Sequence, residues 1–168
     1  MVENKKKTEQ LSYVVALPSM APDLARMWKS LIQEEAPPLM EAGPGGEAAC
    51  ARTLVQMLED TERCISFMAM ESGHPIGFIL GYTYTRPYGQ PAHAGQILHW
   101  YVDSSYRGRG VGQVLYGYLM DWFARKRIEI VEVMARDEPD RDQSWCSKGF
   151  TVTLRIYAKR LPAIPPSI

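Results

Sequence analysis

The spacing of apolar residues changes repeatedly along the chain and divides it into short strands and helices. Alternating or continuous apolar runs predict strands, whereas apolar residues three and four positions apart predict helices. The predicted strands cover residues 11–17, 63–71, 76–85, 96–103, 128–136 and 150–161. The predicted helices cover residues 18–36, 46–59 and 112–127, and residues 137–149 hold one more short helix.

The order of these elements predicts a mixed sheet. Hairpins in the first half of the chain give antiparallel neighbours, and a strand, helix and strand in the second half give a parallel pair. We therefore expect an α/β fold in a single domain of 168 residues. Residues 1–10 are expected to be a flexible N-terminus, residues 37–46 a loop, and residues 162–168 a proline-rich tail without regular structure.

Composition excludes several classes of partner. Nineteen basic and nineteen acidic residues leave no net charge, so no overall field attracts nucleic acid or an anionic membrane. No apolar run approaches the roughly 18 residues of a membrane span, and we expect a cytoplasmic protein. The three cysteines share no CxxC spacing, which argues against a disulfide framework or a bound metal ion.

Glycine and arginine alternate in "YRGRGVGQ", residues 106–113, between a predicted strand and a predicted helix. Backbone amides at a helix N-terminus, with glycines that expose them, form a site for anions. The alternative is a glycine-rich connection with solvated arginines. Two nucleotide-binding spacings are excluded, because GxGxxG requires glycine where Gln113 stands and the P-loop requires a terminal GK[ST].

The spacing Arg107-x-x-Gly110-x-Gly112 resembles the signature [QR]-x-x-G-x-[GA] of the GNAT superfamily of acyl-CoA-dependent N-acyltransferases. "WCSKGF", residues 145–150, is similar to the family's Y-x-x-x-G-F segment, and the order of elements from 11 to 161 also follows the family. The resemblance implies a GNAT-like fold, with a central twisted mixed sheet of about six to seven strands and helices on both faces.

The resemblance also implies acetyl-CoA, or another acyl-CoA, as co-substrate. In the family, the strand before the glycine loop carries a bulge and splays from the next strand, so that pantetheine pairs with both. Tyr101 and Val102 would offer backbone hydrogen bonds, facing Val133 and Met134 across the opening. The pyrophosphate would lie against the backbone of Arg107, Gly108, Arg109, Gly110, Val111, Gly112 and Gln113.

The reaction implied is direct attack of a primary amine on the thioester in a ternary complex. Deprotonating a lysine-like amine of pKa about 10.4 at pH 7 costs about 4.6 kcal/mol, so the base is the demanding component. The family often has glutamate or histidine where Gln96 stands, and a general-acid tyrosine where Trp145 stands. Glutamine can orient a water or the substrate, and an indole N–H donates hydrogen bonds but is no practical acid.

Two other residues are candidates for the base. His99 is the nearest and titrates in the right range, but strand alternation points it away from the Gln96 face unless a bulge resets the phase. Glu71 ends a predicted strand and is the second candidate. His93 lies in the loop before residue 96 and could line an acceptor site. The alternatives are a core or sheet-face histidine for His99 and a surface histidine for His93.

The acceptor is less defined. The resemblance places the acceptor pocket near residues 34–47 and 86–95. The glutamates of the first segment could attract a cationic amine or lie solvated at helix ends. The aromatic residues Tyr82, Tyr84, Tyr88, Trp100 and Tyr101 could line it or follow ordinary alternation on a hairpin. We expect a small-molecule or peptide amine, and the chain could form a homodimer. The alternative function is a non-catalytic acyl-CoA-binding or sensing domain, which the residues at 96 and 145 favour.

Overall fold

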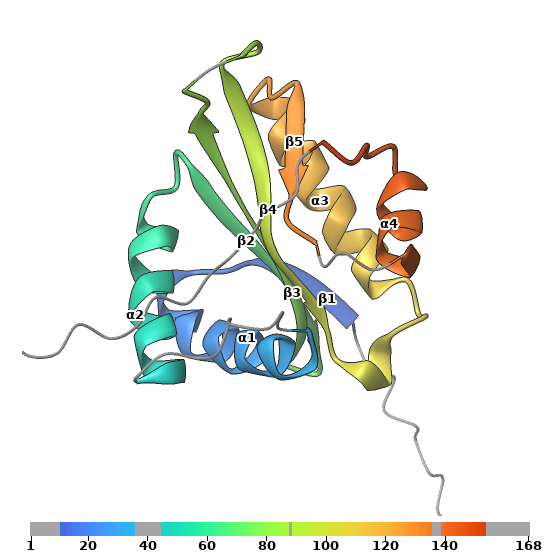
Figure 1. Cartoon of the computed structure of the whole chain (residues 1–168). Helices are drawn as coiled ribbons and strands as arrows, with labels where there is room; N and C mark the ends of the chain where they lie inside the picture. Colours follow the sequence, from blue (N-terminus) through green and yellow to red (C-terminus); the bar gives the residue numbers. More distant parts are fainter. Residues whose placement is uncertain (1–10, 36–44, 88, 136–138, 154–168) are drawn as a thin grey trace, which may run out of the picture.

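The computed structural model describes residues 11–35, 45–87, 89–135 and 139–153 (Figure 1). Its strands are β1 (Leu11–Val15), β2 (Cys64–Glu71), β3 (His74–Thr85), β4 (His93–Val102) and β5 (Ile130–Val133). Its helices are α1 (Ala21–Glu35), α2 (Gly46–Glu59), α3 (Val111–Arg125) and α4 (Pro139–Cys146), with 3₁₀ turns η1 (Pro18–Met20) and η2 (Ser104–Tyr106).

The strands form one sheet in the order β1-β2-β3-β4-β5. The first four are antiparallel neighbours, and β5 pairs in parallel with β4 after the α3 crossover. The predicted mixed sheet is thus confirmed, with five strands in the described ranges rather than six to seven. In the predicted strand 150–161, residues 150–153 have no strand conformation and the rest lie outside the described residues, as do the predicted N-terminus and tail.

Helices cover both faces of the sheet: α1 and α2 lie on one side, and α3 and α4 on the other (Figure 1). The α1/α2 side encloses a core that includes Leu24, Met68 and Phe78. The α3/α4 side encloses a second core that includes Ile79 and Leu115. The adjacent β3 residues Phe78 and Ile79 are both fully buried, because successive side chains of a strand point to opposite faces.

Helix α3 buries a narrower face than its apolar pattern predicts. Val114 and Tyr118 belong to the apolar side of the predicted helix, but they are 40% and 42% exposed. The two residues lie at the margin of the buried line, and Tyr118 stacks on the Phe67 ring at 5.4 Å between centroids. The residues that α3 does bury are Val111, Leu115, Leu119, Trp122 and Phe123.

Several element boundaries also differ from the prediction. Strand β3 begins at His74, because Ser72 and Gly73 have consecutive positive φ angles and close the hairpin in two residues. Strand β4 begins at His93 rather than residue 96, and β5 is limited to four residues. The predicted loop before β4 is correspondingly shorter, and the predicted loop 37–46 lies outside the described residues except at its end.

Two strand glycines allow α3 to lie close to the sheet. A Cβ on Gly95 of β4 would lie 2.5 Å from Cε1 of Phe123, and one on Gly81 of β3 would lie 2.7 Å from Cδ1 of Leu119. Neither neighbour has room to move, because Leu119 and Phe123 are almost fully buried. The distance between α3 and the two central strands therefore depends on glycine at these positions.

We expect Gly95→Ala to lower the free energy of unfolding by about 2 kcal/mol, because the added methyl group overpacks the Phe123 contact. The control is Gly117→Ala in α3, where a Cβ meets no atom within 4 Å. Alanine there should raise stability by about 0.5–1 kcal/mol through helix propensity. Urea unfolding measures both; equal effects of the two substitutions would contradict the close-approach argument.

Candidate active site

A β-bulge in β4 places Gln96 and His99 on the same face of the sheet. Leu80 of β3 pairs with His99, while the next β3 residue, Gly81, pairs with Ile97. Leu98 is therefore the extra residue, and the alternation of β4 shifts by one position there. His99 packs against the Trp28 ring of α1 at 6.5 Å between centroids, on the face where Gln96 meets Tyr82.

The parallel ladder between β4 and β5 ends just before this bulge. Its last pair is Ile97 with Val133, and no described residue of β5 pairs with positions 98–102. The strands thus part at the expected place, but the expected partners differ. Val133 pairs with Ile97 just before the opening, rather than facing Tyr101 across it. Met134 follows the end of β5, and 58% of its surface is exposed.

The glycine loop after β4 presents backbone at the N-terminus of α3. Gly108 and Gly110 have φ angles of +75° and +82°, which side chains of L-residues rarely adopt. Gly110 caps the helix, and Val114 is the first residue whose amide bonds back to it, at 3.1 Å. The three amides before Val114 belong to the first turn, which has no carbonyl partner within the helix.

The glycine loop is surrounded by open space at Gly108 and Gly110 and is closely packed at Gly112. A Cβ on Gly108 or Gly110 would meet no atom within 4 Å. A Cβ on Gly112 would lie 3.3 Å from Cζ2 of Trp100, so the helix start rests directly on β4. The combination leaves the loop accessible to a ligand while fixing its position relative to the opening.

Arg107 connects the loop to β4 and to α1. Its Nε donates to the Val102 carbonyl at 2.8 Å, and its guanidinium pairs with Glu34. One lone pair of the Val102 carbonyl is thereby occupied. The expected backbone contact at Val102 therefore depends on its amide or on the second lone pair.

Arg109 and Glu71 both contact the side chain of Tyr106. The Arg109 guanidinium lies 5.2 Å from the centre of the Tyr106 ring, and the Tyr106 hydroxyl donates to Glu71. Glu71 is thus a partner of the loop on β2, two strands away from β4. The structure therefore does not bring Glu71 together with Gln96 and His99.

Trp145 belongs to an aromatic cluster on the α3/α4 side. Its ring lies 5.6 Å from Trp100 and 5.1 Å from Phe150, and Trp100 in turn stacks on Tyr116. The Lys148 ammonium is 5.9 Å from the Trp145 ring centre. These contacts give Trp145 a packing role beside the loop.

His99 lies in the segment of β4 that no longer pairs with β5. Burial lowers the pKa of its imidazole to about 4, because the apolar surroundings disfavour the charged form. The ring is therefore neutral at pH 7 and is a weak proton acceptor. His93 is exposed at the start of β4, where its Nδ1 lies 3.4 Å from the Thr85 hydroxyl.

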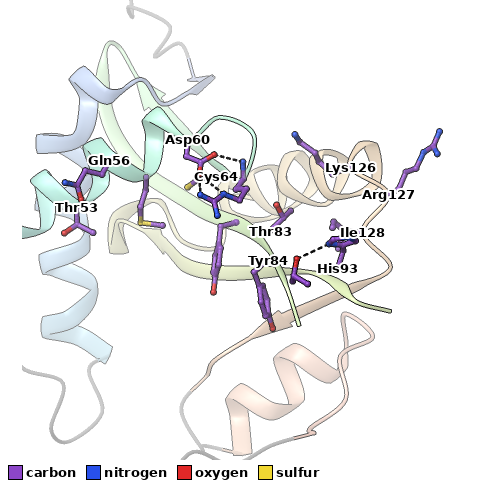
Figure 2. A pocket seen from close by; sticks show the side chains of 14 residues that line it. Thr53, Gln56, Asp60, Cys64, Thr83, Tyr84, His93, Lys126, Arg127 and Ile128 are labelled. Atoms are coloured by element: carbon purple, nitrogen blue, oxygen red, sulfur yellow. Dashed lines mark hydrogen bonds and ion pairs between the residues drawn. The ribbon is translucent and has the colours of Figure 1, made fainter. Parts of the chain in front are cut away.

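Two cavities lie between α2 and the sheet. One of about 290 Å³ is lined by residues that include Trp28, Cys50 and His99. The other, of about 870 Å³, includes Tyr82 and Tyr84, and both cavities share Thr53 and Met57 of α2. In Figure 2, Thr53 and Gln56 stand at one side of the larger cavity and Lys126, Arg127 and Ile128 at the other.

Sequence reasoning missed a polar network at this end of the sheet. The Tyr82 hydroxyl donates to Gln96 Oε1 at 2.7 Å, and the Tyr84 hydroxyl donates to Glu132, which also pairs with Arg86 at 3.5 Å. Burial and the Glu132 carboxylate raise the pKa of Tyr84 to about 12, so it remains a donor. Glu132 lies between two valines in an alternating strand, a pattern typical of a solvent-facing residue, so the sequence carried no signal for this role.

The chain matches the model of the Acetyltransferase (GNAT) family over residues 27–145. It belongs to this family. The matched range includes the bulge, the opening, the glycine loop and α3, and it ends at Trp145. No curated protein sequence matches the chain. No helix in the described ranges is long and apolar enough to cross a membrane.

Solved GNAT structures share the fold at low sequence identity. A GCN5-related N-acetyltransferase from Ralstonia eutropha JMP134 has a TM-score of 0.73 and 19% identity, covering 90% of this chain and 99% of its own. A predicted acetyltransferase with acetyl-CoA from Clostridium acetobutylicum has a TM-score of 0.73 and 16% identity, covering 90% and 96%. An aminoglycoside N-acetyltransferase in complex with CoA has a TM-score of 0.65 and 18% identity, covering 94% and 99%.

The buried His99 predicts a loss of stability on acidification. Its pKa is lower in the folded protein, about 4, than the 6.5 of an unperturbed histidine, so the unfolded state binds the extra proton between these values. The contribution of His99 is complete above pH 6.5 and falls by roughly 3 kcal/mol as the pH approaches 4. Urea unfolding across this range should show a smaller loss for His99→Gln than for the wild type.

The exposed His93 provides the control for this experiment. His93→Gln should follow the wild-type dependence of stability on pH. Equal slopes for wild type and His99→Gln would show that the imidazole titrates normally in the folded protein.

Proposed function

We propose that this GNAT protein transfers the acetyl group of acetyl-CoA to a primary amine by direct attack in a ternary complex. The observation that carries the proposal is the opening between β4 and β5 beside the glycine loop. Strand edge at the opening offers unpaired backbone groups, and the loop offers amides at the positive end of α3. A ligand with an extended amide-containing arm and a pyrophosphate has the two chemical features that these surfaces bind.

The loop residues Arg107 to Gln113 would hold the pyrophosphate mainly through backbone amides. Tyr101 and Val102 would pair with the pantetheine arm along the free edge of β4, and the thioester would then lie near the bulge. The acceptor would enter from the α1/α2 side, where the cavity beside His99 opens. The complexes of two structural neighbours with acetyl-CoA and CoA support this choice of co-substrate.

In this proposal the attacking amine loses its proton to water rather than to a strong base. Neutral His99 has a pKa of about 4, more than six powers of ten below a lysine-like amine, so it is a poor proton acceptor for the ammonium. His99 and the Gln96 amide would instead orient the neutral amine or a water. Attack forms the amide bond and breaks the thioester bond; a thiol of pKa near 8.5 leaves without an obligatory acid, consistent with Trp145.

The same residues favour a second candidate, a non-catalytic acyl-CoA-binding domain. Gln96 is bonded to Tyr82, Trp145 is packed among aromatic rings, and His99 is a weak base. The two functions share the CoA site and differ in whether an amine is consumed.

The CoA site is tested at Gly110 with an isosteric pair of variants. Gly110→Asn and Gly110→Asp accept a similar backbone cost at positive φ and differ in charge. Aspartate at this helix N-terminus stabilises the free protein but repels the pyrophosphate. We expect Gly110→Asp to weaken CoA binding at least tenfold relative to Gly110→Asn in calorimetry, with equal or higher Tm; equal affinities would contradict the loop assignment.

Turnover is tested by release of free thiol from acetyl-CoA over a panel of amines. Because the proposed attack uses an amine that has already lost its proton to water, kcat/KM should rise about tenfold per pH unit from pH 7 to 9, following the neutral fraction of the amine. His99→Gln should retain this slope. Amine-independent CoA binding with no thiol release on the panel would favour the binding domain.

A further inference from the structure

Five polar side chains from β3 and its end, β4 and β5 lie together on the α1/α2 face, in two bonded groups joined by a pair of stacked tyrosine rings. Tyr82, Gln96 and Glu132 are paired in register, so one residue from each strand lies in a single row. Tyr84 lies two positions further along β3 and donates to the Glu132 carboxylate. Arg86, just beyond β3, approaches the second carboxylate oxygen. This row therefore places a carboxylate on β5 beside the amide of β4.

Glu132 stands at the foot of the opening. It immediately precedes Val133, the last β5 residue paired with β4, and its side chain is 33% exposed. Gln96, its partner on β4, lies three residues before His99, but the bulge sets this step opposite two residues of β3, which corresponds to about 7 Å of strand. A ligand on this face can contact Glu132 at one end and reach the opening beside His99 with the other.

The charge of Glu132 is only loosely compensated. Tyr84 donates to Oε2, whereas the Arg86 nitrogen is 3.5 Å from Oε1. A charge-assisted hydrogen bond is shorter, about 2.7–2.9 Å. An incoming ammonium group can therefore take Oε1 from Arg86 while Tyr84 continues to orient the carboxylate.

Two aromatic rings flank the carboxylate. Tyr82 and Tyr84 stack with 5.5 Å between ring centroids, and both line the cavity of about 870 Å³. Aromatic faces attract cations, and a carboxylate beside them attracts ammonium in preference to a neutral hydroxyl group. The chemistry of this corner thus selects a positively charged group.

The nitrogen that binds Glu132 is poorly placed to react. It lies at the foot of the opening, one strand away from Gln96 and about two strand residues short of His99. The carboxylate beside it also favours the protonated amine, which has no lone pair for attack on the thioester. We propose, on the basis of the proposed acetyl transfer, that the acceptor carries at least two amino groups and that Glu132 binds the one that is not acetylated. The second nitrogen, about 7 Å further along the strand, then lies near the opening. The substrate class is a diamine or polyamine.

The test compares pentane-1,5-diamine with 5-aminopentan-1-ol, which has a hydroxyl group in place of one ammonium. Calorimetry on the CoA-saturated full chain measures both affinities without turnover. Wild type should bind the diamine at least tenfold more tightly than the amino alcohol. Glu132→Gln, which can still accept the Tyr84 hydrogen bond, should reduce this preference to less than threefold with an unchanged Kd for CoA.

Two control variants separate ligand binding from structural support. Glu129→Gln makes the same charge change at an exposed position three residues earlier and should retain the wild-type preference. Arg86→Gln removes the competing cation and should tighten diamine binding, whereas a purely structural network predicts weaker or unchanged binding. Absence of a preference in wild type, or an undiminished preference in Glu132→Gln, would overturn the proposal.

The acetyl-transfer assay is a separate result. Thiol release without a preference for the diamine would retain the proposed function and reject the Glu132 site. A preference for the diamine without thiol release would retain the binding site and reject acetyl transfer.

Discussion

The β-bulge at Leu98 is the feature on which the rest of the site depends. One extra residue in β4 brings Gln96 and His99 to the same face and coincides with the end of the β4–β5 ladder. A regular strand would direct the imidazole into the α3/α4 core and would continue to pair with β5. The bulge therefore determines both that His99 lines the cavity of about 290 Å³ and where the opening begins.

Close packing on the opposite side keeps this arrangement in place. Glycines in β3 and β4 let α3 lie against the sheet, and Gly112 lets its first turn rest on Trp100. These contacts thus fix the position of the glycine loop relative to the opening. Arg107 adds a connection from the loop to the last carbonyl of β4 and to α1. An anion bound by the loop would consequently be aligned with the free edge of β4.

Groups of opposite polarity are separated along β4. The helix N-terminal amides of the glycine loop lie beside one end of the strand, the Glu132 carboxylate and the Tyr82 and Tyr84 rings lie near the other, and a neutral imidazole lies between them. In the proposed reaction this separation would suit an anionic donor and a cationic acceptor, because each would be attracted to its own end. It would also let a protein without net charge bind two oppositely charged ligands.

The sequence by itself determined the mixed sheet, the order of its elements and the loop at Arg107-x-x-Gly110-x-Gly112. These follow from periodicity and from glycine spacing, which are local properties of the chain. The structure alone decided the side on which His99 lies, the engagement of Glu71 with Tyr106, and the meeting of Tyr84 with Glu132, 48 residues apart. A bulge and a strand register arise from packing between segments distant in sequence, so no local pattern contains them.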